Sequence, residues 1–470
     1  MGYPANPPRS EARLLRSARD YFCCPDEFLH YRLSGELSPE SEYFEFGSDT
    51  LCYGRSVRTV AEPRPAAGSP RSAPGSSSDA TLLLPFDPDE AIDNLRLERY
   101  PGCRLDRLER KLKSTYYSLR PFTSRPLRGF VQRFRAGNWK NRRFPRWPVD
   151  TTVENICEGL LLRSMQAHGV DSIPFIWFWP GGAQGCVVIT HDVETSAGRD
   201  FCSGLMDLDA SFGFLSSFHV VPEVRYAVSA AFLNSFRDRG FEVCVQDLNH
   251  DGRLFDDPEE FRRRAALINR YGREFGARGF RSGVLYRNPE WFGHFDFSFD
   301  MSVPNVAPLD PQRGGCCTVM PYFIGRLLEL PLTTVQDYTL FHVLREKSVD
   351  LWRLQLEIIL AKNGIATFLV HPDYILDRET QAIYRDLLTL LRDVREKQSV
   401  WCALPREVDA WWRMRSRLSI VRDDGSWRIV GEGAESARLA FARNSDGRLT
   451  FEMAVDSPSP LPAANRRMIR

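Results

Sequence analysis

Histidine and acidic residues follow a short apolar run of this 470-residue chain at the point where the run ends. The run is CVVIT, and His191, Asp192 and Glu194 come directly after it. Carboxylates and imidazoles can hold a divalent ion, and the same groups can take up and release protons. An ion held in this way lowers the pKa of a bound water molecule. The stretch is therefore typical of metal-assisted hydrolysis.

Polar side chains also lie in or directly after five later apolar runs. They are His219, Gln246 and His250 in QDLNH, Arg281 in RSG, Asp337 in VQD, and His371 in LVHP. Structural alternatives exist, because the pair His191-Asp192 could cap a helix. Arg281 could form a structural ion pair, and the dipeptide Asp251-Gly252 could simply make a turn. The order of the whole set favours one shared site.

Short apolar runs alternate with helical patterns from about residue 153 onward. The runs, which predict strands, cover residues 187–190, 216–221, 241–246, 279–282, 329–334 and 366–370. Cap and stop residues predict helices at 222–240, 257–275 and 351–360. This alternation predicts a parallel sheet, most simply a barrel. In such barrels the chemistry gathers at the C-terminal ends of the strands, where the polar residues above stand.

The composition divides the chain into five ranges. We predict a small N-terminal segment at 1–60, a flexible Pro/Ser/Gly linker at 61–79, a basic and partly helical segment at 80–150, a (β/α) barrel at 151–405, and a helix with a small β appendage at 406–470. The fold class is therefore α/β, a barrel with an N-terminal mixed α/β extension and a small C-terminal β appendage.

Charge is distributed unevenly along the chain. Residues 104–148 carry fourteen Lys and Arg against two acidic residues, although the net charge of the whole chain is +1. This segment could contact a membrane or an anionic polymer, or pack against the acidic remainder of the molecule. No nucleic-acid motif accompanies it, so no nucleic acid partner is expected. Without an apolar run of roughly 18 residues or a secretory signal, we expect a cytoplasmic protein, at most peripheral to a membrane.

The motifs between residues 187 and 374 resemble those of the polysaccharide deacetylases of the NodB-homology type, carbohydrate esterase family 4. THDVE corresponds to the first motif, QDLNH to the second, RSG to the third, Asp337 to a later aspartate and LVH to the last motif. The resemblance implies a distorted (β/α) barrel that removes acetyl groups from N-acetylated sugars. It also implies a divalent metal cofactor, zinc first, with cobalt or nickel as alternatives.

The resemblance assigns roles to seven residues. Asp192 would be the general base, oriented by Arg281, while His371 would be the general acid, tuned by Asp337. The metal residues would be Glu194, His250 and Gln246, where the family has aspartate for Glu194 and histidine for Gln246. His191 and His219 would be auxiliary nitrogen ligands. Trp291, Tyr286 and Tyr322 are candidates for stacking on a sugar ring, although each could be a core residue.

The sequence thus predicts a metal-dependent hydrolase of amide bonds in N-acetylated amino-sugar glycans, with a role in exopolysaccharide metabolism as one setting. The carboxamide of Gln246 is a weaker ligand than the imidazole it replaces. A carbohydrate-binding protein of the same fold, with impaired catalysis, is therefore the alternative. A glycoside hydrolase is a third interpretation, since Asp192 with Asp337 or Asp373 could imitate its paired carboxylates.

Overall fold

The computed structural model describes residues 12–47, 50–57, 81–103 and 143–454. Two compact units are formed from separate parts of the chain. The first unit comprises residues 1–95, 152–177 and 414–470, and the second comprises 96–151 and 178–413. Residues 152–177 thus group with the N-terminal and C-terminal ranges and not with the predicted barrel. The predicted linker 61–79 and most of the basic segment 104–148 lie outside the described residues.

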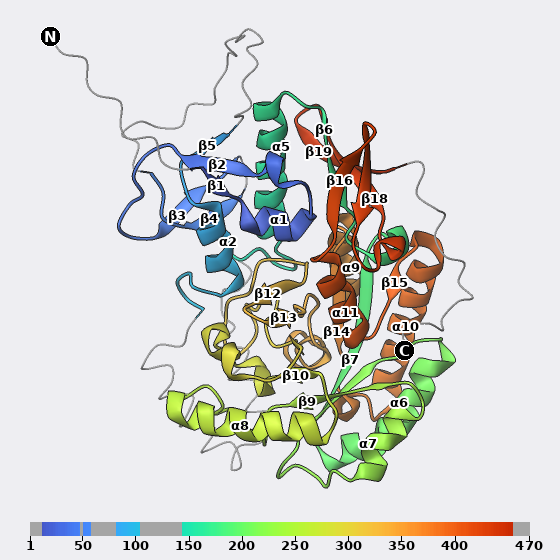
Figure 1. The fold of residues 1–470 in the computed structure, drawn as a ribbon. Coiled ribbons are helices and arrows are strands. Elements are labelled where there is room, and N and C mark those ends of the chain that lie inside the picture. Colours follow the sequence, from blue (N-terminus) through green and yellow to red (C-terminus); the bar gives the residue numbers. More distant parts are fainter. Residues whose placement is uncertain (1–11, 48–49, 58–80, 104–142, 455–470) are drawn as a thin grey trace, which may run out of the picture. The chain divides into compact units, whose positions relative to one another are not determined.

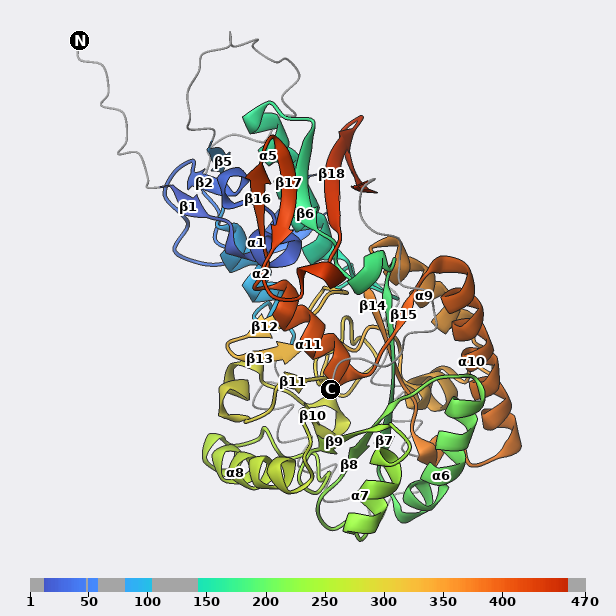
Figure 2. The same cartoon turned by 45° about the vertical axis from the view of Figure 1, so that its right-hand side comes forward.

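The second unit is built on a curled, mostly parallel sheet (Figure 1). Its strands are β7 (Cys186–Val193), β8 (Ser217–Val220), β9 (Glu242–Gln246), β10 (Gly279–Arg281), β11 (Phe299–Asp300), β12 (Tyr322–Ile324), β13 (Leu327–Glu329), β14 (Ile365–Leu369) and β15 (Trp401–Cys402). The order is β12-β13-β11-β10-β9-β8-β7-β14, with β15 also paired to β7, and only β12–β13 is antiparallel. Figure 2 shows β7 to β11 succeeding one another around the curl.

Helices follow most of these strands, as the alternating pattern predicts. They are α6 (Ser196–Ser211), α7 (Ala230–Arg237), α8 (Pro258–Glu274), α9 (Asp350–Ala361), α10 (Arg378–Gln398) and α11 (Pro405–Arg415). The start of α8 is fixed because the Asp257 side chain accepts hydrogen bonds from the backbone N–H groups of Glu259 and Glu260. Its buried face, with Phe261 and Ile268, joins the one large apolar core of this unit.

The predicted barrel is not closed by a continuous strand ladder in the described residues. The predicted strand 329–334 is not continuous, because β13 ends at Glu329 and pairing resumes only as an isolated bridge between Leu332 and Pro304. Instead, the hydroxyls of Thr333 and Thr334 donate to the carbonyls of Ile365 and Thr367 at 2.7 and 2.8 Å. The structure therefore shows a mixed α/β unit with a curled half-barrel sheet.

The first unit holds the short strands of both chain ends. Its elements are β1 (Arg13–Leu14), α1 (Arg16–Phe22), β2 (His30–Leu33), β3 (Glu42–Glu45), β4 (Leu51–Gly54), β5 (Leu82–Leu84), α2 (Pro88–Arg96), α5 (Thr152–His168), β6 (Ser172–Ile176), β16 (Ser419–Asp423), β17 (Ser426–Val430), β18 (Leu439–Ser445) and β19 (Arg448–Met453). Asp-Gly pairs with positive φ turn both C-terminal hairpins. β18 pairs with β6 as well as with β19, so these three strands form one sheet, while β16 and β17 form a sheet of their own.

Candidate functional site

Neighbouring strands bring three buried polar side chains together inside the curled sheet. Arg281 on β10 pairs in register with Gln246 on β9, and both reach Asp192 on β7. Arg281 Nη1 lies 2.7 Å from Asp192 Oδ1, while Gln246 Nε2 donates to Asp192 Oδ2 at 2.9 Å. Their exposed fractions are 0–2%. Both oxygens of this carboxylate are therefore fixed, as an oriented general base requires.

The guanidinium of Arg281 is itself held by the backbone around it. Its Nε donates to the carbonyl of Met301 at 3.0 Å, and Nη1 also donates to the hydroxyl of Thr190 at 3.0 Å. That hydroxyl donates in turn to the carbonyl of Phe368 on β14. Sequence reasoning assigned no role to Thr190, although it shares the inward face of β7 with Asp192.

His371 and Asp337 form a second couple at the end of β14. His371 Nδ1 lies 2.6 Å from Asp337 Oδ1, and the backbone N–H of His371 donates to Oδ2 at 2.7 Å. Burial disfavours a charged imidazole, but the charge and hydrogen bond of Asp337 outweigh it and raise the pKa of His371 to about 10. The ring therefore keeps a proton that it can give to a leaving group.

Glu194 lies between two imidazoles. Its Oε1 is 2.8 Å from His250 Nε2 and 3.6 Å from His371 Nε2. Burial opposes ionisation of this carboxyl, yet the contact with His250 and the charge of His371 hold its pKa well below the usual range. Burial also disfavours a charged His250, but Glu194 outweighs this and raises the pKa of His250. The three side chains form an ion-pair cluster next to Asp192.

The backbone at Glu194 is held by Asp373. One carboxylate oxygen accepts the N–H of Glu194 at 3.0 Å, and the other accepts the hydroxyl of Thr195, which is the N-cap of α6. Arg225 Nε donates to the carbonyl of Glu194 at 2.9 Å. Asp373 therefore positions the metal-motif residue. Because both oxygens of Asp373 accept hydrogen bonds from the chain, this residue does not support the glycoside hydrolase alternative, in which it would be one of two catalytic carboxylates.

His250 comes from a strained turn after β9. Asp247 and His250 both have positive φ, at 52° and 57°, which is uncommon for residues other than glycine. Asp247 is fully buried, with Oδ2 lacking a hydrogen-bond partner, and burial raises its pKa. A Cβ on Gly283 would lie 2.4 Å from this oxygen and 3.1 Å from His250 Cδ2. Glycine in the RSG motif thus leaves room for the turn.

Two predicted auxiliary ligands do not join the cluster. His191 is directed away from it, with Nδ1 2.7 Å from the carbonyl of Val370 and Nε2 3.0 Å from Asp209. His219 is fully buried beside Ser217, and burial together with the charge of Arg281 lowers its pKa well below the ordinary value. Alternation along a strand places neighbouring side chains on opposite faces, and this signal distinguishes His191 from Asp192.

The three aromatic candidates pack within the second unit. Trp291 is half-buried, with ring centroids of Phe255 and Phe261 at 6.2 and 5.1 Å. Tyr322 is buried, and its hydroxyl donates to the carbonyl of Arg96 at 2.9 Å. Tyr286 is buried as well. The contacts of these three aromatic residues thus favour a packing role over stacking on a sugar ring.

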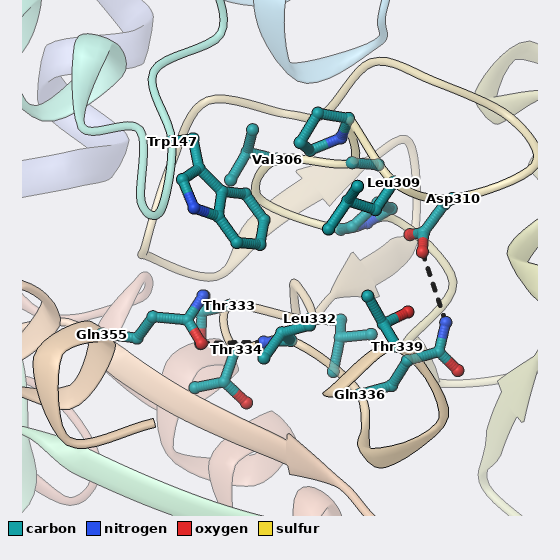
Figure 3. Close-up of a pocket in the computed structure, with 14 residues that line it drawn as sticks. Trp147, Val306, Leu309, Asp310, Leu332, Thr333, Thr334, Gln336, Thr339 and Gln355 are labelled. Atoms are coloured by element: carbon teal, nitrogen blue, oxygen red, sulfur yellow. Dashed lines mark hydrogen bonds between the residues drawn. The ribbon is translucent and has the colours of Figure 1, made fainter. Parts of the chain in front are cut away.

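A small hollow elsewhere in the second unit has no part in this site. Figure 3 shows Trp147 and Leu309 facing Thr333 and Gln336, with the Gln336 amide donating to Asp310 at 3.3 Å. None of the predicted site residues lines it.

The predicted metal ligands do not form a three-residue group. Among the described residues, no three His, Cys, Asp or Glu side chains are grouped so that they could hold a metal ion. Glu194 Oε1 and His250 Nε2 lie 2.8 Å apart, and Gln246 Nε2 donates to Asp192. Gln246 Oε1 and both ring nitrogens of His250 have no hydrogen-bond partner, so the zinc ion stays a prediction. No described helix is long and apolar enough to cross a bilayer.

Comparison with solved structures finds matches that cover about half of the chain. No protein-family model and no curated protein matches it. Solved structures that resemble it include a "putative polysaccharide deacetylase from Mycobacterium smegmatis", at 16% identity and TM-score 0.40, covering 51% of this chain and 93% of that one. Puue allantoinase has 13% identity and a TM-score of 0.39, and the match covers 50% of this chain and 92% of that one. A "probable Polysaccharide deacetylase from Pseudomonas aeruginosa PAO1" has 12% identity and TM-score 0.38, covering 50% and 93%.

Proposed function

We propose that this protein is an amide hydrolase that removes acetyl groups from N-acetylated amino-sugar glycans. Two contacts carry the proposal. Arg281 orients the buried carboxylate of Asp192, and Asp337 keeps a proton on His371. General base and general acid catalysis need these two states at the same time. The choice of an acetylated glycan comes from the resemblance of the motifs.

The reaction balances with the residues present. Asp192 takes a proton from water while the water oxygen attacks the acetyl carbonyl carbon. The tetrahedral intermediate then expels the sugar nitrogen, and the electron pair of the C–N bond goes to that nitrogen. His371 Nε2 gives the nitrogen a proton, since Nδ1 is engaged by Asp337. Acetate and the free amino sugar leave, and proton transfer through water restores both residues.

Acetate release from N-acetylglucosamine oligomers tests this function. Wild type should release acetate, and Asp192→Asn or His371→Gln should lower kcat by about 10²- to 10⁴-fold, as expected for loss of general acid or base catalysis. Each assay is run after chelation and again with added zinc, so that the result does not depend on the cofactor. Arg263→Met, on the exposed side of α8, is the control and should match wild type.

Two results would contradict the proposal. Equal acetate release by wild type and Asp192→Asn would remove the assigned base. Oligomer binding by calorimetry without any acetate release would favour the carbohydrate-binding alternative. That alternative has one observation in its support, the carboxamide of Gln246 in place of a histidine.

A further inference from the structure

The loop that follows β8 is fastened to the ends of the two neighbouring strands. The Tyr226 hydroxyl donates to the carbonyl of Val193, at the end of β7, at 2.7 Å. The backbone N–H of Glu223 donates to the carbonyl of Leu248, just after β9, at 3.0 Å. Segments that follow the C-terminal ends of the strands border the site in (β/α) barrels. This loop is therefore a fixed part of the border of the candidate site.

A strained turn in this loop directs Arg225 to the end of β7. The N–H of Arg225 donates to the carbonyl of Glu223 at 2.8 Å, which closes a three-residue turn around Val224. Val224 has a φ of 72° and is 85% exposed. A β-branched residue rarely adopts positive φ, and such strain persists only where surrounding contacts enforce it. The turn brings Arg225 beside Glu194, whose carbonyl accepts a hydrogen bond from Arg225 Nε at 2.9 Å.

The charge of Arg225 has no carboxylate as its partner among the residues that the structure describes. Its side chain is half-buried and makes one hydrogen bond there, the one from Nε, so that Nη1 and Nη2 are available. The carboxylate of Asp373 is engaged by the backbone N–H of Glu194. The carboxylate of Glu223, in the loop itself, accepts the hydroxyl of Tyr271 at 2.9 Å. A guanidinium fixed at Nε can bind both oxygens of an incoming carboxylate with its two terminal nitrogens.

We propose that Arg225 binds a carboxylate of the substrate, which makes an acidic N-acetylated glycan the preferred substrate class. The carboxylate belongs to a sugar next to the acetylated one. This inference deepens the proposed function and rests on it for the placement of the acetylated sugar beside Asp192. Arg225 is a specificity-determining residue in this reaction and takes no part in the bond changes.

Two glycans that differ only in charge test this inference. The probes are a hyaluronan tetrasaccharide, in which N-acetylglucosamine alternates with glucuronic acid, and the methyl ester of the same tetrasaccharide. Binding of each to the full chain is measured by calorimetry at low salt. Wild type should bind the acid about 10-fold more tightly than the ester, and added salt should reduce this preference.

Three variants assign the preference to Arg225. Arg225→Gln removes the charge, keeps a side-chain N–H and should bind acid and ester alike. Arg225→Lys keeps the charge without the planar fork and should retain part of the preference. Arg263→Met, which removes an exposed arginine of α8, is the control and should retain all of it. If Arg225→Gln does not fold, Arg225→Lys is measured in its place.

The outcomes separate this inference from the proposed function. Equal binding of acid and ester by wild type, or binding of neither, would overturn the inference. A preference that persists in folded Arg225→Gln would also overturn it, because another cation would then bind the carboxylate. Preference for the acid without acetate release from any glycan would refute the hydrolase and leave the carboxylate site standing. Acetate release with equal binding of the two probes would refute the carboxylate site alone.

Discussion

Breaking the ion pair between Arg281 and Asp192 should strongly destabilise the second unit, because both partners are buried. Their side chains are 0% and 3% exposed, at an N···O distance of 2.7 Å. Arg281→Met removes the counter-charge of Asp192 as well as hydrogen bonds to Thr190 and Met301. Leaving one member of a buried pair without its partner costs about 3–5 kcal/mol. We expect a loss of that size in the free energy of unfolding.

The chain contains a control with the same geometry and the opposite burial. Arg263 lies 2.7 Å from Glu260, with side chains 62% and 35% exposed. Water screens this pair, so Arg263→Met should leave stability unchanged within error. Both variants can be followed by thermal and urea unfolding, using circular dichroism and tryptophan fluorescence. Only the transition that contains residues 178–413 should move in Arg281→Met.

A double-mutant cycle makes the test sharper. In the Asp192→Asn background no buried anion remains at this position, so Arg281→Met should be less destabilising than in wild type, by about 2 kcal/mol or more. Equal losses in the two backgrounds would show that Arg281 acts through packing or through its backbone contacts. If Arg281→Met were as stable as Arg263→Met, burial would not decide the strength of these pairs, and the reasoning would be refuted.

Three further variants test burial, space and packing in the second unit. Burial raises the pKa of Glu242 to about 7, although the backbone N–H and the charge of Arg406 act to lower it. In the folded protein this carboxyl therefore keeps its proton up to about pH 7, whereas in the unfolded chain it loses the proton near pH 4.5. Its contribution to stability is full below about pH 4.5 and is lost as the pH rises to 7, and Glu242→Gln should flatten the change of Tm between pH 5 and 8. Gly283→Ala should destabilise the protein by about 1–3 kcal/mol and lower the rate of acetate release, because the added Cβ would crowd Asp247. Gly293→Ala is the control and should do neither, since no atom lies within 4 Å of its added Cβ. Equal Tm values for the two variants would contradict the predicted crowding at Gly283. Trp291→Ala should lower Tm and leave KM unchanged, and a raised KM at unchanged stability would restore its sugar-stacking role.

The sequence predicts β7, β8, β9, β10 and β14 because each is a short apolar run that ends in polar residues, but it does not predict β11, β12 or β15. The predicted runs at 187–190 and 241–246 agree with β7 and β9 to within a few residues. The helix predicted at 222–240 exists but is shorter, since α7 covers only Ala230–Arg237. There the Tyr226 hydroxyl donates to the carbonyl of Val193 and accepts the N–H of Val221, which holds the chain as a loop. Such long-range contacts leave no local pattern in a sequence.

The membership of the site was likewise easier to predict than its contacts. The C-terminal ends of parallel strands lie at the same edge of a sheet. The positions of Asp192, Arg281 and His371 at such strand ends are therefore enough to predict that they lie near one another. The contact of Glu194 with His250 depends on side-chain length and on a positive φ at His250, and neither follows from a spacing rule. Alternation along β7 by itself places His191 and Asp192 on opposite faces of the strand.

The departures from the family's motifs are mutually consistent. Glu194 reaches His250, Gln246 donates to Asp192, and Gly283 leaves the space that Asp247 fills. Each of these three residues therefore makes a contact within the site or makes room for one.

Several of the buried polar atoms that lack a hydrogen-bond partner lie within this site. Among its described residues these atoms are Gln246 Oε1, Arg281 Nη2, Asp247 Oδ2 and both ring nitrogens of His250. An unmet buried donor or acceptor costs about 1–3 kcal/mol, more when it is charged, so a fold retains few of them without a use. A polar ligand or a water molecule beside Asp192 and His371 would satisfy such atoms. The number of unpartnered atoms is therefore consistent with the proposed hydrolase site.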